Sequence, residues 1–330
     1  MKLGLHYSFQ VAAHEDVAKV IGQGLEDIAA ADKDGFSSVV FAEHHFLEDG
    51  WLPRPMQLAA AAAAVTKSIR IGTDIVVLPL HHPVAVAEEA AVVDVLSNGR
   101  FVLGVGLGWI EAEFKGFGVP YNERAKVYDQ SLDIVKRLLA GESVSNDGHY
   151  SFTNARIRPL PVNPNGVPLW MGALANIAIK RVARVGDAWI MPPGTRLADL
   201  VRQRKLLLEE REAAGLEPMK EQPLRREAFV AETDEKAWEL FAHGLRHEYG
   251  DVYRPLHPTY PNNDNLDNLK KWGEDMFVVG SPETVADDLR RYEQELGVTE
   301  CLVRFQLPHV PPGALRECFA GLRDVKRMIA

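Results

Sequence analysis

Three side chains that can take part in chemistry follow a short apolar segment near the start of the chain. Residues 37–42 read Ser-Ser-Val-Val-Phe-Ala, and Glu43, His44 and His45 come directly after them. The short β-branched run predicts a buried parallel strand. Its carboxyl end is where α/β sheets place their ligands. An imidazole there can donate or accept a proton near neutral pH, so we expect Glu43 and His44 to be site residues.

The two adjacent histidines are not equivalent in this prediction. Side chains alternate between the two faces of a strand, so only one of His44 and His45 can face the site. A histidine at a strand end can also be a hydrogen-bonded structural residue. We favour His44 over His45 for the functional role.

Asp74 lies near the end of another apolar segment, residues 69–78. A buried carboxylate needs a partner, so Asp74 either belongs to the site or bonds a backbone group or a neighbouring histidine. The adjacent pairs His44–His45 and His81–His82 lack the i, i+4 spacing of ligand pairs on a metal-binding helix. We therefore predict no metal site.

The glycine-rich segment 104–108 follows a predicted strand but lacks the G-x-G-x-x-G spacing of dinucleotide-binding folds. Small residues here would admit a flat ligand or a large neighbouring side chain. Trp109 and Met191 follow strands on the same predicted face as His44 and Asp74. Together these residues indicate a wide, mostly apolar slot with polar groups at its edge, a pocket suited to a planar aromatic cofactor.

Composition excludes several classes of protein. The chain has 330 residues and a net charge of -9, with no block of basic residues, which argues against a nucleic-acid surface. It has two cysteines, Cys301 and Cys318, too few for a disulfide framework. We find no signal peptide and no membrane-spanning run, and expect a cytoplasmic protein without a membrane partner.

The order of elements predicts one repeated strand–helix unit. Short apolar segments alternate with helical patterns along the whole chain, which favours an α/β fold with a single (β/α)8 TIM barrel, one domain over residues 1–330. Insertions near 141–168 and 250–272 interrupt it, and the second is expected to be a mobile loop. The predicted strands are residues 3–9, 37–42, 69–78, 101–106, 169–171, 187–191, 227–231 and 301–305.

Several stretches resemble the bacterial luciferase-like flavin monooxygenase family. They are residues 42–46 (Ala-Glu-His-His-Phe), 71–79 (Ile-Gly-Thr-Asp-Ile-Val-Val-Leu-Pro), 99–106, 185–190 and 279–283 (Val-Gly-Ser-Pro-Glu). They occur in the family's order over nearly the whole chain.

The resemblance implies a barrel that binds reduced FMN at the carboxyl ends of the strands. It implies O2 addition to give a C4a-peroxyflavin and oxidation of a small organic substrate, with a separate flavin reductase and a homodimer packed through the early helices. His44 matches the family's active-site histidine, and Glu43 precedes it at the ring edge. Asp74 and Ile75 fall where the family often has a non-prolyl cis peptide.

The flavin contacts predicted from the slot and from the resemblance together are Asp74, Ile75, Gly106, Leu107, Trp109, Ala173, Leu174, Ala175, Asn176 and Met191. Two positions depart from the family. Leu107 stands where the luciferase catalytic subunit has an Arg that helps to hold the flavin phosphate, and Leu174-Ala175-Asn176 stands where many relatives have Ser. The phosphate could still bind backbone N–H groups at that helix start, assisted by Asn176.

Two other functions stay open at this stage. The first is an oxidoreductase that uses the deazaflavin F420 and transfers hydride without O2. The second is a non-catalytic flavin-binding partner subunit, for which the departures at Leu107 and Leu174 argue. Within the second insertion, Tyr253, Arg254 and His257 are candidate lid contacts or parts of an exposed loop.

Overall fold

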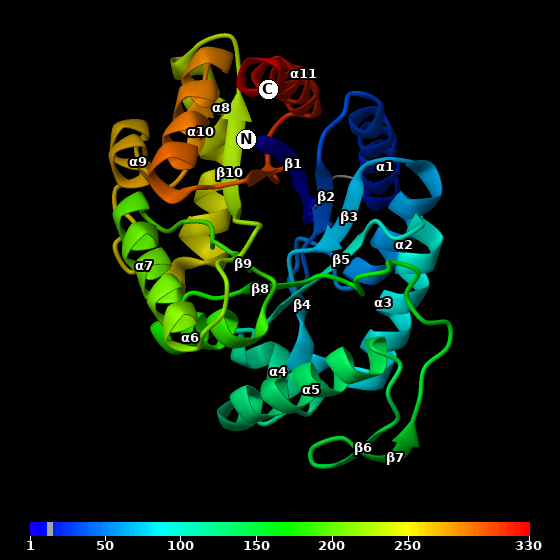
Figure 1. The fold of residues 1–330 in the computed structure, drawn as a ribbon. Coiled ribbons are helices and arrows are strands. Elements are labelled where there is room, and N and C mark those ends of the chain that lie inside the picture. Colours follow the sequence, from blue (N-terminus) through cyan, green and yellow to red (C-terminus); the bar gives the residue numbers. More distant parts are fainter. Residues whose placement is uncertain (12–15) are drawn as a thin grey trace.

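The computed structural model describes residues 1–11 and 16–330, and its centre is one curved sheet of parallel strands (Figure 1). The strands of this sheet are β1 (Lys2–Tyr7), β2 (Ser38–Phe41), β3 (Arg70–Thr73), β4 (Val76–Val77), β5 (Phe101–Gly106), β8 (Leu169–Gly172), β9 (Ala188–Ile190), β10 (Pro223–Val230), β11 (Val278–Gly280) and β12 (Glu300–Arg304). Their order in the sheet is β11-β10-β12-β1-β2-β3-β5-β8-β9, and β4 pairs with β5.

Helices lie outside this sheet and connect its strands (Figure 1). They are α1 (Val17–Lys33), α2 (Pro55–Val65), α3 (Pro83–Ser97), α4 (Glu111–Phe117), α5 (Arg124–Leu139), α6 (Asn176–Val185), α7 (Leu197–Ala213), α8 (Asp234–Leu245), α9 (Leu266–Gly273), α10 (Pro282–Leu296) and α11 (Pro312–Ile329). Short helical turns are η1 (Leu78–Leu80), η2 (Tyr121–Glu123), η3 (Arg246–Val252) and η4 (Arg254–Leu256). Among the described residues, none of these helices has the length and apolar character needed to cross a bilayer.

The predicted parallel α/β sheet is confirmed, and each predicted strand falls on an observed one. The seventh predicted strand, residues 227–231, corresponds to β10, which begins earlier, at Pro223. The strand β11 was not predicted. At the open end of the strand order, two isolated parallel bridges join Ala188 to Glu221 and Met191 to Leu224. The Met191 N–H also donates to the carbonyl oxygen of Pro223 over 2.9 Å. The edge strand β9 therefore lies against β10.

Helix boundaries follow local chemistry. The α3 helix has Pro83 in its first turn and ends at Asn98, whose φ of 57° is left-handed, as the Ser-Asn-Gly sequence predicts. The α10 helix starts at Ser281, whose Oγ accepts from the Thr284 N–H over 3.3 Å, and ends at the left-handed Gly297. These caps fix where each helix joins its strand.

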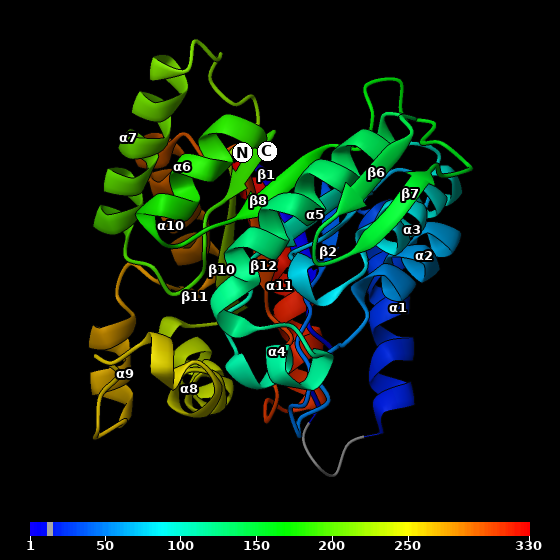
Figure 2. The same ribbon diagram turned by 90° about the horizontal axis from the view of Figure 1, so that it is seen from below.

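The two insertions have structure of their own. Residues Val144–Asp147 (β6) and Ser151–Ala155 (β7) form an antiparallel hairpin in the first insertion, which lies beside α5 on the outside of the molecule (Figure 2). The second insertion holds part of η3, all of η4 and most of α9, so much of it is helical rather than irregular.

Glycines in the sheet permit very close packing around β3. A Cβ at Gly104 would overlap the carbonyl oxygen of Thr73, and a Cβ at Gly106 would lie 2.7 Å from the Ile75 side chain. The sequence left two roles open for this glycine-rich segment, space for a flat ligand or space for a neighbouring residue. The structure shows the second role, because Thr73 and Ile75 pack against these glycines.

We predict that Gly104→Ala lowers the free energy of unfolding by at least about 3 kcal/mol, because the added methyl group must displace backbone in a packed sheet. Gly22→Ala is the matched control: Gly22 is exposed within α1, and a Cβ there meets nothing within 4 Å. The control should gain about 0.5–1 kcal/mol from lower unfolded-state entropy. Urea unfolding measures both, and equal stabilities of the two variants would contradict the packing argument.

Candidate active site

Residues at the carboxyl ends of the strands form the candidate site. His44 follows β2, the Asp74–Ile75 step separates β3 from β4, and Trp109 follows β5. The segment after α8 brings Tyr253 over the same edge, where its hydroxyl meets His44. These residues come from distant parts of the sequence, and the parallel sheet places their strands' ends together.

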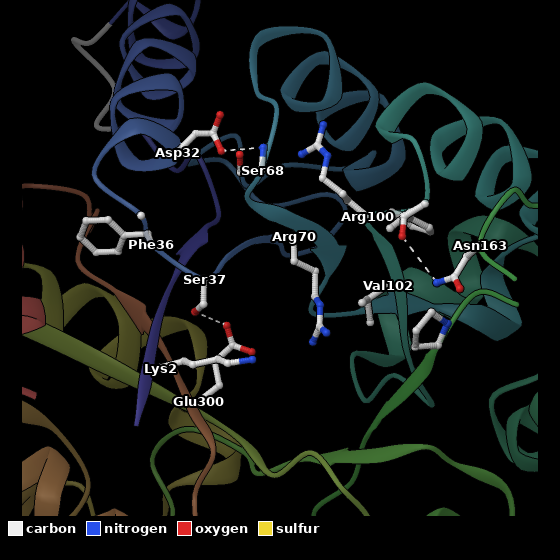
Figure 3. Close-up of a pocket in the computed structure, with 14 residues that line it drawn as sticks. Lys2, Asp32, Phe36, Ser37, Ser68, Arg70, Arg100, Val102, Asn163 and Glu300 are labelled. Carbon is white, nitrogen blue, oxygen red and sulfur yellow. Dashed lines mark hydrogen bonds between the residues drawn. The ribbon is translucent and has the colours of Figure 1, made fainter. Parts of the chain in front are cut away.

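A hollow of about 490 Å³ lies at the opposite end of the sheet, at the amino-terminal ends of the strands (Figure 3). Its polar groups already bond one another. Glu300 accepts hydrogen bonds from Ser37 and Ser38, and Arg70 pairs with Glu221 over 2.6 Å. Because these groups are paired within the protein, this hollow offers few free polar atoms to a ligand.

His44 is held by a buried carboxylate that the sequence did not reveal. Glu113, on α4, is fully buried, and its Oε1 lies 3.0 Å from His44 Nδ1. The same oxygen accepts the His45 backbone N–H over 2.8 Å. A carboxylate that accepts there assigns the Nδ1 proton to His44, which leaves Nε2 as the basic nitrogen. The Tyr253 hydroxyl donates to Nε2 over 3.1 Å.

Aromatic rings enclose the His44 imidazole, which is 7% exposed. The Trp51 ring centroid lies 4.5 Å from it and that of Tyr253 lies 6.0 Å from it. Tyr253 also stacks on Trp109 at 5.5 Å. Tyr253 therefore covers Nε2 of His44, and its role as a lid contact stays a prediction. Arg254 and His257 are placed elsewhere: Arg254 bonds Asn262, and His257 packs on Tyr249 and Trp272.

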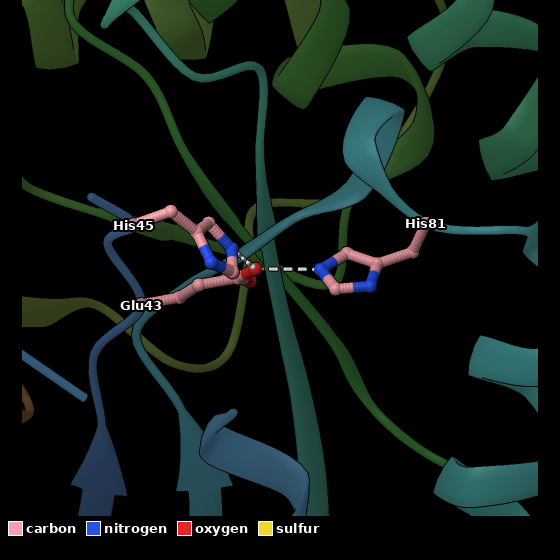
Figure 4. Close-up of side chains that lie close together, drawn as sticks. All are labelled: Glu43, His45 and His81. Carbon is pink, nitrogen blue, oxygen red and sulfur yellow. Dashed lines mark hydrogen bonds and ion pairs between the residues drawn. The ribbon is translucent and has the colours of Figure 1, made fainter. Parts of the chain in front are cut away.

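Glu43 and His45 point away from the His44 ring. Glu43 Oε1 lies 2.6 Å from Nε2 of His45 and 2.6 Å from Nε2 of His81 (Figure 4), and its Oε2 accepts the Val77 N–H over 2.8 Å. Burial alone would raise the pKa of Glu43, but the hydrogen bonds from His45 and His81 outweigh it and lower the pKa to about 2. The side-chain alternation predicted for residues 43–45 is confirmed, whereas a catalytic role for Glu43 stays a prediction.

His6, Asp74 and Arg225 form a buried polar cluster. Asp74 Oδ2, His6 Nδ1 and Arg225 Nε are buried and have no hydrogen-bond partner among residues 1–11 and 16–330. The peptide bond between Asp74 and Ile75 is cis, as the resemblance implied. Burial raises the pKa of Asp74 to about 6, against the opposing effect of the Arg225 charge. Unsatisfied buried groups of this kind require a water or a ligand, so the slot is more polar than the sequence suggested.

The remaining predicted flavin contacts are of two kinds, partly exposed side chains and buried ones. Leu107 and Trp109 are partly exposed, and Leu174 is 48% exposed just before α6. The α6 helix starts after Ala175 without a side-chain cap, and the Ala178 N–H already donates to the Ala175 carbonyl oxygen, which leaves the N–H groups of Asn176 and Ile177 for an anion. Ala173 is 8% exposed and Gly106 packs against Ile75. Met191 is fully buried and bridges to β10, and its contact with a flavin stays a prediction.

Buried ion pairs fasten the covering segment 246–253 to the sheet. The Arg304 guanidinium, fully buried at the end of β12, donates from Nη1 and Nη2 to the two carboxylate oxygens of Glu248 over 2.6 and 3.0 Å. The Tyr249 hydroxyl donates to Glu227 Oε2 over 2.9 Å. At the edge, His247 Nε2 lies 2.9 Å from Asp49 Oδ2. The position of Tyr253 thus depends on charges from β10, β12 and the 47–52 loop.

The chain matches a family model described as luciferase-like monooxygenase over residues 1–300. A curated relative from Sinorhizobium fredii, itself uncharacterized, is 33% identical over 178 residues, which are 52% of this chain and 50% of that protein. The limonene 1,2-monooxygenase of Rhodococcus erythropolis is 28% identical over 310 residues, covering 86% of this chain and 75% of the relative.

Solved structures with the same fold bind two different cofactors. The oxygenating constituent of 3,6-diketocamphane monooxygenase from Pseudomonas putida, in complex with FMN, has a TM-score of 0.82 at 19% identity and covers 100% of this chain and 98% of that one. An F420-dependent secondary alcohol dehydrogenase, in complex with an F420-acetone adduct, has a TM-score of 0.78 at 19% identity, covering 100% and 99%. Likeness at this identity shows the fold alone.

We predict that Arg304→Met lowers the free energy of unfolding by about 3–5 kcal/mol, because it leaves the Glu248 charge buried without its partner. The double variant Arg304→Met/Glu248→Met should recover much of that loss, since neither charge is then left alone. Urea unfolding of wild type, both single variants and the double variant completes the cycle. Additive losses would show that the two charges act independently.

The His247–Asp49 pair should make stability depend on pH. Its hydrogen bond to Asp49 raises the pKa of His247 above the ordinary 6.5, and Glu248 and Asp251 act in the same direction. The folded protein then holds this proton more tightly than the unfolded chain, so the stabilisation is complete below about pH 6.5 and is lost as pH rises through the folded pKa.

The test compares unfolding free energies of wild type and His247→Gln from pH 6 to pH 9. The difference in unfolding free energy between wild type and His247→Gln should become smaller as the pH rises. His309, whose ring lies 5.1 Å from that of His247, provides the control His309→Gln, which should leave this trend in place. A wild-type advantage that stays constant over this range would exclude His247 as its source.

Proposed function

Because the chain belongs to the luciferase-like monooxygenase family, we propose that it is a flavin-dependent monooxygenase. It uses reduced FMN and O2 to oxidise a small organic substrate, and a separate reductase supplies the reduced flavin. The observation that carries the proposal is the chain of contacts from Glu113 through His44 to Tyr253 at the carboxyl ends of the strands. Nε2 of His44 would then protonate or deprotonate a reacting group once Tyr253 gives access to it.

We infer that the scaffold is one domain over residues 1–330, closed into a (β/α)8 barrel. The bridges of Ala188 and Met191 to the start of β10 support closure, because they join the last strand of the β10-to-β9 path to the first. β11 then extends β10 at its carboxyl end. Such a barrel gathers all the site residues at one rim.

The residues present fit a flat cofactor with an anionic tail. Asp74 and Arg225 would hold its polar ring, because Asp74 Oδ2 and Arg225 Nε are buried atoms that still need partners. The uncapped start of α6, with Asn176, would hold the phosphate in place of the absent family Arg and Ser. When bound, reduced flavin supplies the electrons that activate O2.

The protein residues manage protons and water. Glu113 keeps the Nδ1 proton on His44, so Nε2 faces the space that Tyr253 covers. Once Tyr253 moves aside, Nε2 can hold or transfer a proton at an oxygen atom of the reactants. Trp51 and Trp109 exclude water from that position.

Apolar side chains are exposed on α2 and α3 at Val65, Val92, Val95 and Leu96, which supports a homodimer packed through the early helices.

The likeness of the fold to an F420-dependent dehydrogenase supports a second candidate function, hydride transfer without O2. Phosphate at the start of α6 would suit either cofactor.

Anaerobic titration with reduced FMN and, separately, reduced F420 distinguishes these candidates. We expect binding of reduced FMN, followed by O2 consumption and formation of an 18O-labelled product from a panel of small ketones, alkenes and aldehydes under 18O2. Binding of reduced F420 without O2 consumption would replace the monooxygenase proposal. Binding of neither would favour the non-catalytic partner subunit.

His44→Ala should lower formation of the labelled product by roughly 10²–10⁴-fold, the usual contribution of a positioned acid–base group, while the affinity for reduced FMN changes little. The control is His149→Ala, because His149 is exposed on the β6–β7 turn. Product formation at the wild-type rate in His44→Ala would remove His44 from the mechanism.

A further inference from the structure

We propose that Glu43, His45 and His81 form a binding site for one divalent transition-metal ion of the zinc type. One carboxylate oxygen and two imidazole nitrogens converge there, all within 4.8 Å of one another (Figure 4). Two imidazoles and one carboxylate, with a fourth position open to water, are a donor set that Zn2+ accepts. This proposal concerns a separate cluster and does not rest on the proposed monooxygenase function.

The three ligand atoms are held in place before any ion enters. The Val77 N–H binds Glu43 Oε2 over 2.8 Å, which leaves Oε1 directed at the two rings. The His45 ring packs edge-on against Phe117 at 4.6 Å. The Glu43 side chain is fully buried and the His45 side chain is 5% exposed. Little side-chain freedom remains to be lost when the ion binds.

A small movement converts the present hydrogen bonds into metal ligation. Glu43 Oε1 lies 2.6 Å from each Nε2, whereas tetrahedral ligands about 2.0–2.1 Å from zinc lie roughly 3.3 Å apart. The atoms need to separate by less than about 1 Å. Each ring must also present an unprotonated Nε2, so its proton moves through water to Nδ1 and both imidazoles stay neutral.

Arg54 opposes this change at His81. Its Nη1 donates to His81 Nδ1 over 3.1 Å, which favours a proton on Nε2, the nitrogen that must bind the ion. Metal binding therefore requires the exposed Arg54 side chain to swing away. Removing Arg54 should tighten metal binding, a result that a purely hydrogen-bonded cluster would not produce.

The His81 side is the route of entry, because the His81 side chain is 12% exposed and the other two ligands lie beneath it. The ion would join the end of β2 to the turn after η1. Since side chains alternate along residues 43–45, it would lie on the face opposite the His44 ring.

The test uses the full chain, treated with EDTA and then titrated with Co2+, whose visible d–d absorption reports tetrahedral ligation. We expect one Co2+ per chain, displaced by Zn2+. His81→Ala should weaken Co2+ binding by at least roughly 100-fold, above the usual effect of losing a group that supports a ligand. Arg54→Gln should tighten it. His82→Ala is the control, because His82 is exposed beside His81 and caps α3, and it should bind Co2+ like wild type.

Glu43→Gln is a second loss variant that keeps the side-chain volume, and it should also lose the Co2+ spectrum. Circular dichroism confirms that each variant is folded before titration. Absence of a d–d spectrum at stoichiometric Co2+ in the wild-type chain would overturn the proposal. So would a spectrum that persists in His81→Ala but disappears in His82→Ala.

Discussion

The candidate site depends on one buried carboxylate oxygen, Oε1 of Glu113. A charge without solvent must be paired or hydrogen-bonded, and this oxygen accepts from both the His44 ring and the His45 backbone. The hydrogen bond to Nδ1 fixes the tautomer of the His44 ring. The bond to the His45 N–H fixes the backbone conformation after β2. Because Glu113 sits on α4, a short helix after β5, the orientation of the His44 ring after β2 depends on a strand–helix unit two strands away in the sheet.

Further buried charges place the cover over that nitrogen. Arg304 and Glu248 are both fully buried, and such pairs gain little net stability over an apolar core because both ions lose their hydration. Their effect is geometric: they hold the segment that carries Tyr253 against the sheet. The segment is therefore attached to the sheet through polar side-chain contacts with β10 and β12.

Patterns of apolar residues within short segments of the sequence predicted much of the fold. Apolar runs located the strands up to β5, although the single predicted strand 69–78 is two short strands followed by a helical turn. Alternation separated His44 from Glu43 and His45. Contacts between distant segments had no local signal. Glu113 lies beside Lys115 in a short polar-looking helix, and the charged run at the start of β10 hid that strand's true beginning, although Arg226 is fully buried.

His45 links the two clusters at the end of β2. Its side chain bonds Glu43, while its backbone N–H bonds the Glu113 oxygen that also holds His44. A shift of His45 toward or away from Glu43 therefore moves a backbone group bonded to Glu113, and the Glu113 carboxylate in turn holds the His44 ring. Alternation keeps the two sets of side chains on opposite faces, so they can bind different groups. The shared backbone makes their geometries interdependent, and a change at the His81 side can reach the His44 ring through this one residue.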